Sequence, residues 1–305
     1  MWRMTRLPFG VLLLAAVALI LLGHWKDAPA TPVAATRVAA LALAGPPAPA
    51  MSRDCPPAPA FAAAAAANQG SLTTAPWTVF HRPELGWAVY EPLTAHEIGT
   101  SCPADAAGFA AALAGWQKSH ALPPTGIMDA ATMDALRIVW MSRRPFVLLM
   151  RTGCPPGPDP SQLVSARPDE GYGGKAIQLT PGALAAYRDL VAAARAESPE
   201  VRADPRLLAI ISGYREPLAD AIHCMLQGDC GTPARANCSA HRTGEAMDLY
   251  LGAAPGRGPA DSDDANRLYQ ASSPAYVWLV RNAARFGFEP YAFEPWHWEW
   301  TGPGA

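Results

Sequence analysis

Histidines and carboxylates gather in two short stretches of the C-terminal third of the chain. The first is Ser-Ala-His-Arg-Thr-Gly-Glu-Ala-Met-Asp, residues 239–248, and the second is Glu-Pro-Trp-His, residues 294–297. Zinc takes imidazole nitrogen and carboxylate oxygen readily, and a hydrolytic zinc site keeps three protein ligands and one open position. His241, Asp248 and His297 would fill the three protein positions.

Glu294 is then the carboxylate left over. It stands three residues before His297, so it can lie beside the open position and take a proton from a water molecule there. The turn at Gly244 lets the chain fold back, so the first two ligands converge from one local segment, while His297 must arrive from a second strand. This division of ligands and base suits the hydrolysis of an amide bond.

Further side chains near these stretches are candidates for contact with a substrate. Arg215 closes the sequence Ser-Gly-Tyr-Arg just beyond an apolar run, where a guanidinium could stabilise an oxyanion or bind a substrate carboxylate. We also expect Tyr214, Ser239 and Trp296 to contact the substrate. Taken singly, these residues also have structural interpretations: a lone histidine is more often a packed or surface residue, an aspartate on a strand can face water, and an arginine after a strand is usually an ion-pair partner.

The three motifs occur in a distinctive order. Ser-Gly-Tyr-Arg at 212–215 is followed by Ser-x-His-x-x-Gly-x-Ala-x-Asp at 239–248 and by Glu-Pro-Trp-His at 294–297. This order resembles the zinc D-alanyl-D-alanine carboxypeptidases of the VanY-like kind. The resemblance covers most of the C-terminal 130 residues and implies the α+β fold of the DD-peptidase group.

The resemblance also implies a role for each motif residue. It makes His241, Asp248 and His297 the ligands of Zn²⁺. It makes Glu294 the catalytic base and Arg215 the residue that stabilises the transition state. These roles agree with those inferred above from the residue types and their spacing.

Two positions depart from the family pattern near the mouth of the expected site. The family often has a glutamate where this chain has Ala240, and Cys238 stands where a glycine is common. We expect the terminal D-alanine of peptidoglycan stem peptides to be the leaving group. An L,D-carboxypeptidase, a D,D-dipeptidase or a wall endopeptidase would use the same zinc and base. A non-catalytic wall-binding protein is the alternative of another class, which an intact Glu294 disfavours.

The N-terminal quarter resembles an export segment followed by a spacer. Residues 1–26 are predicted to be a signal peptide or a signal anchor, because two arginines precede an uncharged run over residues 7–23. We favour an anchor in the inner membrane, with the rest of the chain on the periplasmic or cell-wall side. Residues 27–75 are rich in alanine and proline and are predicted to be a linker.

Residues 76–153 are predicted to form a small helical module. Phe109, Leu113 and Trp116 recur at helical spacing, and Asp129 is positioned to cap a second helix. Helix, glycine-containing turn and helix together resemble a peptidoglycan-binding module of the three-helix type. A helical hairpin that only packs on the catalytic part is the alternative.

After a proline-rich linker at residues 154–172, residues 173–305 are predicted to form the zinc peptidase domain. Its helices and strands mix without a βαβ rhythm, so we expect an α+β fold with a small, mainly antiparallel sheet flanked by helices. The expected helices are 181–196 and 276–286, and the expected strands are 207–212, 246–251 and 296–300.

Charge and cysteine content narrow the possible partners and compartments. A net charge of −2 lacks the basic surface that nucleic acid requires. Six cysteines fit disulfide formation outside the cytoplasm. We expect Cys224 to pair with Cys230 or Cys238, and Cys102 to pair with Cys154. A zinc site made of cysteines alone is disfavoured because no close C-x-x-C pair is present.

Overall fold

The computed structural model describes residues 55–227, 231 and 236–302. The predicted signal segment and most of the predicted linker lie outside these residues. Over the described ranges, no helix is both long enough and apolar enough to cross a membrane.

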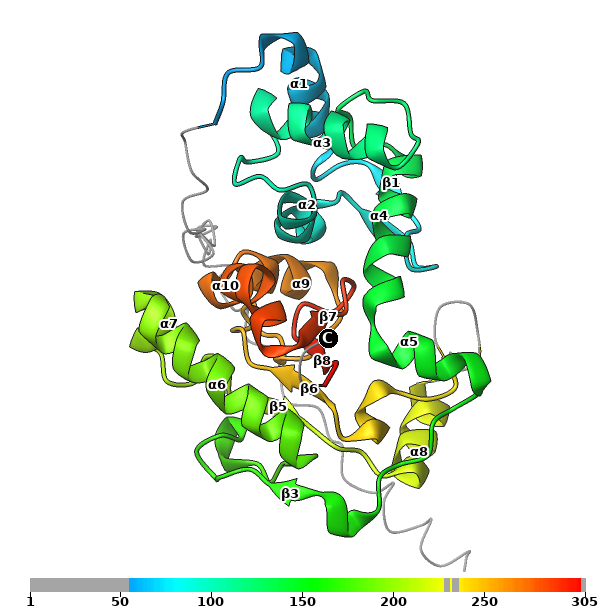
Figure 1. The fold of residues 1–305 in the computed structure, drawn as a ribbon, viewed down its shortest axis with the longest axis vertical. Helices are drawn as coiled ribbons and strands as arrows, with labels where there is room; N and C mark the ends of the chain where they lie inside the picture. The colour runs from blue at the N-terminus through cyan, green and yellow to red at the C-terminus, as the bar shows by residue number, and fades with distance from the viewer. Residues whose placement is uncertain (1–54, 228–230, 232–235, 303–305) are drawn as a thin grey trace, which may run out of the picture. The chain divides into compact units, whose positions relative to one another are not determined.

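The first part of the described chain is mainly helical (Figure 1). Its α-helices are α1 (Ala62–Ser71), α2 (Glu91–Glu97), α3 (Ala107–Ser119), α4 (Ala130–Arg143) and α5 (Pro145–Leu149). Its strands are β1 (Pro76–Trp77) and β2 (Glu84–Leu85), and its 3₁₀ helices are η1 (Pro59–Phe61), η2 (Ala88–Tyr90) and η3 (Met150–Thr152).

Both helices expected in this region are present. The Asp129 side chain accepts a hydrogen bond from Thr132 N at 2.8 Å, which confirms the predicted cap of α4. Phe109 and Leu113 on α3 are fully buried, as their spacing predicts. The turn between the helices needs Gly126, whose φ is +70° and whose added Cβ would lie 2.5 Å from Ala110 O.

The alanine run expected in the linker forms α1, and this helix is folded onto the rest of the helical part. Asn68 is fully buried; its amide donates to Gly126 O at 2.9 Å and accepts from Met128 N at 2.8 Å. A disulfide joins Cys55 to Cys102. Residues 55–75 therefore belong to the helical part of the structure.

The second part mixes helices with one two-stranded sheet and one four-stranded sheet. Its strands are β3 (Val164–Ser165), β4 (Gln178–Leu179), β5 (Ile210–Ser212), β6 (Ala246–Leu249), β7 (Phe288–Pro290) and β8 (His297–Trp300). Its α-helices are α6 (Pro181–Glu197), α7 (Pro199–Ala203), α8 (Pro217–Gln227), α9 (Asp264–Ala271) and α10 (Pro274–Asn282). Its 3₁₀ helices are η4 (Pro160–Gln162), η5 (Tyr172–Gly174), η6 (Ala240–Thr243) and η7 (Ala283–Phe286).

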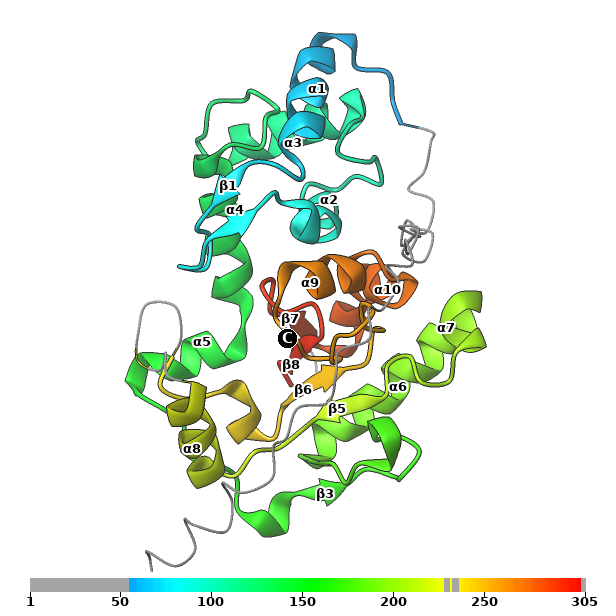
Figure 2. The same cartoon turned by 180° about the vertical axis from the view of Figure 1, so that it is seen from behind.

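The prediction of an α+β fold with a small antiparallel sheet is confirmed. The largest sheet has the strand order β5-β6-β8-β7, and all of its neighbouring strands are antiparallel. Both views show α9 and α10 lying between α2 and strands β7 and β8 (Figures 1 and 2). The strand expected at 207–212 begins only at Ile210, because Leu208 adopts a positive φ of 67° that interrupts an extended backbone.

The stretch predicted to be the second linker is tied to the domain that follows it. Strand β3 pairs with β4 in antiparallel register, and Gly171 bridges to Ile210 at the edge of the large sheet. Cys154 forms a disulfide with Cys238. The predicted pairs Cys102–Cys154 and Cys224–Cys238 are therefore wrong, because Cys102 pairs with Cys55 and Cys154 pairs with Cys238.

Cys224 is also disulfide-bonded. Its predicted pairing with Cys230 lies outside the described residues.

One hydrophobic core runs through both parts of the chain. Phe80, from the loop between β1 and β2, packs its ring 5.7 Å from that of Tyr291 and 5.5 Å from that of Phe293. The helical part therefore packs directly on the second part, as the hairpin alternative supposes. Glycan binding by residues 76–153 remains a prediction.

The buried carboxylate of Glu170 makes folding sensitive to acid. It accepts from Arg188 Nε at 2.7 Å and from Arg167 N at 2.6 Å. Burial alone would raise the pKa of Glu170, but Arg188 and Arg167 lower it below its usual value. A lowered pKa stabilises the folded chain above the unfolded pKa of about 4.3, and this stabilisation is lost as the pH falls through the folded pKa.

We expect Glu170→Gln to lower the free energy of unfolding by about 1–2 kcal/mol at pH 7, because Arg188 is partly exposed and its ion pair is screened. The difference from the wild type should shrink as the pH falls from 5 to 3. Denaturant unfolding across this range measures it, with Asp189→Asn, an exposed carboxylate on the same helix as Arg188, as control. A difference that stays constant with pH would contradict the prediction.

Candidate metal centre

Strand register brings two of the predicted ligands face to face. Asp248 on β6 lies directly opposite His297 on β8. Directly opposed residues of antiparallel strands project from the same face with Cβ atoms about 5 Å apart. The two side chains therefore meet, with His297 Nδ1 3.0 Å from Asp248 Oδ1.

His241 reaches the same point from the 3₁₀ helix η6. Ser239 caps this helix by accepting from His241 N at 3.3 Å, and Gly244 ends it with a left-handed φ of 71°. The ring Nδ1 lies 2.8 Å from Gly213 O. Because a carbonyl can only accept, Nδ1 carries the proton and Nε2 is left to face Asp248 Oδ2 at 3.2 Å.

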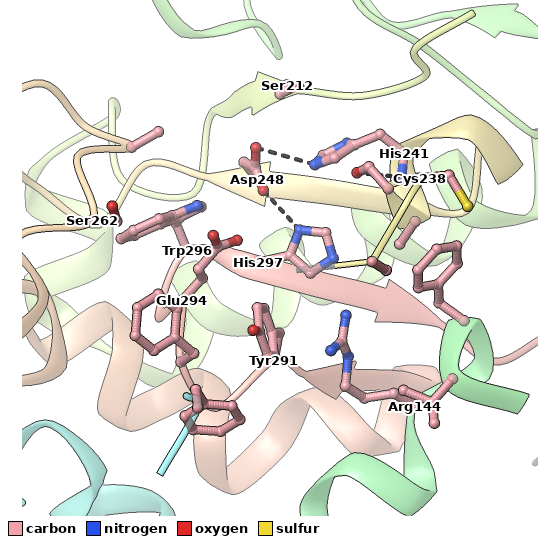
Figure 3. A pocket seen from close by; sticks show the side chains of 18 of the residues that line it. Arg144, Ser212, Cys238, His241, Asp248, Ser262, Tyr291, Glu294, Trp296 and His297 are labelled. Carbon is pink, nitrogen blue, oxygen red and sulfur yellow. Dashed lines mark hydrogen bonds and ion pairs between the residues drawn. The ribbon is translucent and has the colours of Figure 1, made fainter. Parts of the chain in front are cut away.

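The three side chains form a cluster that could hold a metal ion. One ligand atom from each of His241, Asp248 and His297 lies within 4.8 Å of the others, and all three residues are buried (Figure 3). Ligand atoms of a tetrahedral zinc site are about 3.3 Å apart, close to the two contacts made by Asp248. Two imidazole nitrogens and a carboxylate oxygen are also a suitable donor set for a borderline divalent cation.

The charged and ionisable groups of the cluster shift one another's protonation. Burial alone would raise the pKa of Asp248, but the imidazoles of His241 and His297 hold it well below its usual range. Burial alone would lower the pKa of His297, but its hydrogen bond to Asp248 and the nearby carboxylate of Glu299 raise it to about 9. Asp248 therefore stays ionised, which is the form in which a carboxylate binds a metal.

Glu299 stands behind His297. Its Oε1 lies 3.4 Å from His297 Nε2, in an ion-pair contact that lacks the geometry of a regular hydrogen bond. Burial would raise the pKa of Glu299, but Arg144, and after it His297, lower it to about 2. Histidines that ligate a metal commonly have a carboxylate beside their other ring nitrogen, and Glu299 occupies that position here.

Glu294 borders the cluster at the edge of a cleft of about 820 Å³. Its backbone N–H donates to Tyr291 O at 3.0 Å, and its carbonyl accepts from His297 N at 2.9 Å, so a tight turn holds it next to the third ligand. Figure 3 shows its carboxylate beside Asp248 and His297. Burial raises the pKa of Glu294. A raised pKa makes the ionised carboxylate a stronger proton acceptor, as a general base requires.

Arg215 lines the same cleft and is linked to the first ligand. Its backbone N–H donates to His241 O at 3.1 Å, and its guanidinium pairs with Asp220 at 3.3 Å. Asp220 is buried and also accepts from Ser239 N at 2.9 Å. Arg242 makes a further ion pair with Asp220. The two segments that carry the first ligand and Arg215 are thus joined through one carboxylate.

The predicted substrate contacts are placed differently from one another. Ser239 and Trp296 line the cleft. Tyr214 does not line it, and its hydroxyl lies beside Gly157, 3.0 Å from where a Cβ on that glycine would stand. Of the three, two are therefore placed beside the metal cluster.

Three residues around the cluster were not predicted as site residues: Asp220, Glu299 and Arg144. The sequence does contain a signal for Glu299, because the alternation at 296–300 places its side chain on the same face of the strand as that of His297. Asp220 and Arg144 had none, because their contacts depend on how distant segments pack.

Comparisons with family models, curated proteins and solved structures find no match for this chain.

Proposed function

We propose that the chain is a zinc-dependent D-alanyl-D-alanine carboxypeptidase of the VanY-like kind, acting on peptidoglycan stem peptides. The observation that carries the proposal is the convergence of His241, Asp248 and His297 beside Glu294 in one open cleft. A purely structural metal site would normally close its fourth position with protein and would need no neighbouring base.

In this proposal His241 Nε2, an oxygen of Asp248 and His297 Nδ1 hold the ion. When bound, zinc polarises the scissile carbonyl and makes water a stronger nucleophile at neutral pH. Glu294 takes the proton of the attacking water and passes it to the leaving amine. Arg215 donates hydrogen bonds to the oxygen on which negative charge develops.

The disulfides support the proposed location of the protein outside the cytoplasm. Disulfides form and persist outside the cytoplasm, and two are present with described partners. We propose that residues 7–23 anchor the chain in the inner membrane and that the enzyme works on the periplasmic or cell-wall side.

The test is mass spectrometry of a muropeptide mixture incubated with the full-length chain and zinc, with a chelated sample as control. Chelator-sensitive loss of a single terminal alanine from pentapeptide stems is the expected result. Loss only from tetrapeptides would make the enzyme an L,D-carboxypeptidase, and loss of a dipeptide would make it a D,D-dipeptidase. Cleavage of cross-links would make it an endopeptidase. If zinc is bound and no species changes, the non-catalytic wall-binding alternative replaces the proposal.

A further inference from the structure

The end of α4 sends a side chain from the helical part toward the metal cluster. Pro145 starts α5, and a residue that precedes proline is disfavoured in the helical region. Arg144 accordingly leaves the helix, with φ −68° and ψ 123°. Figure 3 shows its side chain extending from this helix to the region of Tyr291 and His297.

Arg144 and Phe146 hold both oxygens of the Glu299 carboxylate. Arg144 Nε donates to Glu299 Oε1 at 2.9 Å, and Arg144 Nη2 donates to the same oxygen. The N–H of Phe146 donates to Glu299 Oε2 at 3.0 Å. The Arg144 and Glu299 side chains are only 8 % and 2 % exposed, so water does not compete for these bonds. The helical part thus fixes the orientation of the carboxylate that stands behind His297.

Tyr291 packs against both the arginine and the histidine. The Arg144 guanidinium carbon lies 3.9 Å from the centre of the Tyr291 ring, a cation–π contact. The same ring meets the His297 imidazole edge to face, with centroids 6.1 Å apart. The guanidinium is therefore held in place by Glu299 and by Tyr291, and each of these also contacts the third ligand.

We propose that Arg144 is a positioning residue of the metal centre, acting through Glu299 on His297. Glu299 can hold the Nε2 side of the imidazole only if its own carboxylate is fixed, and Arg144 and Phe146 are what fix it. The ring is then oriented with Nδ1 toward Asp248. The inference rests on the proposed metal site, and it makes the helical part a component of that site.

The helical part also lines the cleft that contains the metal cluster. Met141, Phe146, Val147 and Met150 line it from α4, α5 and η3. Residues near the end of α4 therefore contribute to one wall of the cleft as well as to the support of the third ligand. A substrate that reaches the metal cluster would pass this wall.

The test is the metal affinity of Arg144→Met in the full-length chain. Removing a group that orients a metal ligand typically lowers metal affinity or activity by about 10- to 100-fold. We expect Zn²⁺, measured by competition with a chromophoric chelator, to bind about 10- to 100-fold more weakly than to the wild type. The visible absorption of the Co²⁺-substituted protein should also shift, because the orientation of one ligand has changed.

Arg143→Met is the matched control. This neighbouring arginine ends the same helix and pairs with Glu97 at 2.7 Å, but its side chain is 46 % exposed and its partner lies on α2. We expect its Zn²⁺ affinity and its Co²⁺ spectrum to equal those of the wild type. Arg144→Lys keeps the charge but not the planar fork of donors, so it should restore the affinity only in part.

Loss of Arg144 leaves Glu299 buried without its cation, which could prevent folding. The double variant Arg144→Met with Glu299→Gln removes this charge, and it should fold while still binding Zn²⁺ more weakly than the wild type. Wild-type affinity and Co²⁺ spectrum in whichever Arg144 variant folds would overturn the positioning role alone. A wild-type chain that binds neither metal would instead overturn the proposed metal site and this inference with it.

Discussion

Replacing Glu294 by glutamine is expected to lower kcat by about 10²–10⁴-fold, the usual contribution of a positioned general base. Glutamine has nearly the same shape but cannot accept a proton at neutral pH. The ligand set His241, Asp248 and His297 is untouched, so the variant should bind Zn²⁺ in the same ratio as the wild type. The measurements are the rate of alanine release from a pentapeptide stem and the zinc content of the purified variant.

The control is Glu289→Gln. Glu289 stands five residues earlier on β7, its pKa is also raised by burial, and it does not line the cleft. Unchanged activity in this variant would show that the loss at Glu294 is not a general effect of neutralising a partly buried carboxylate. Full activity of Glu294→Gln would exclude Glu294 as the base. Loss of zinc from Glu294→Gln would make Glu294 a fourth protein ligand and would favour the wall-binding alternative.

The strands of the site could be predicted from the sequence, but their register could not. Strict alternation at 296–300 indicates that His297 and Glu299 share a face of a strand, and β8 confirms a strand at this place. Which residue of β6 would lie opposite His297 depends on pairing between segments nearly fifty residues apart. A shift of one residue would turn Asp248 to the other face of the sheet.

The cysteine pairs show the same limit. The predictions are a local partner for Cys224 and a Cys102–Cys154 pair that brackets one module. The observed separations are 47 residues for Cys55–Cys102 and 84 for Cys154–Cys238. Loop-closure entropy grows only slowly with loop length, so a long separation is no obstacle once packing has brought the thiols together.

The contribution of the helical part had no local signal. Arg143 and Arg144 are adjacent and chemically identical, and both lie beside the end of α4. One forms an exposed pair with Glu97, while the other is buried against Glu299. The difference arises from the break in the helix, which Pro145 indicates in the sequence, and from the docking of the two parts, which only the three-dimensional structure shows.

A second buried ion pair joins the two parts close to the proposed base. Arg267 Nη1 lies 2.9 Å from Glu84 Oε2, and Arg267 Nη2 donates to the Tyr90 hydroxyl at 2.6 Å. Burial raises the pKa of Tyr90 far above its usual value, so the hydroxyl stays protonated. It donates a hydrogen bond to Glu84 Oε2 at 2.5 Å. Arg267 Nε also donates to the carbonyl of Phe293, the residue before Glu294, at 2.8 Å.

Glu84→Gln is therefore expected to lower the free energy of unfolding by about 2–3 kcal/mol, because it removes the buried counter-charge of Arg267 and leaves only the more exposed Asp264, 3.2 Å from Arg267 Nη1. Tyr90→Phe keeps the ion pair and removes only a hydroxyl, so about 1–2 kcal/mol is expected. Glu97→Gln breaks the more exposed pair with Arg143 and should cost less than about 1 kcal/mol. Denaturant unfolding of the full-length chain measures all three variants.

The order of the three losses in unfolding free energy tests whether the two parts of the chain depend on the contact between Glu84 and Arg267. If Glu84→Gln costs no more than Glu97→Gln, the guanidinium of Arg267 has another way to be solvated, and the two parts do not depend on this contact. If the expected order holds, the carbonyl next to Glu294 is anchored by a guanidinium whose buried counter-charge comes from the helical part. Residues 55–153 would then stabilise the turn that carries the proposed base, and the candidate site would belong to the whole described chain rather than to residues 173–305 alone.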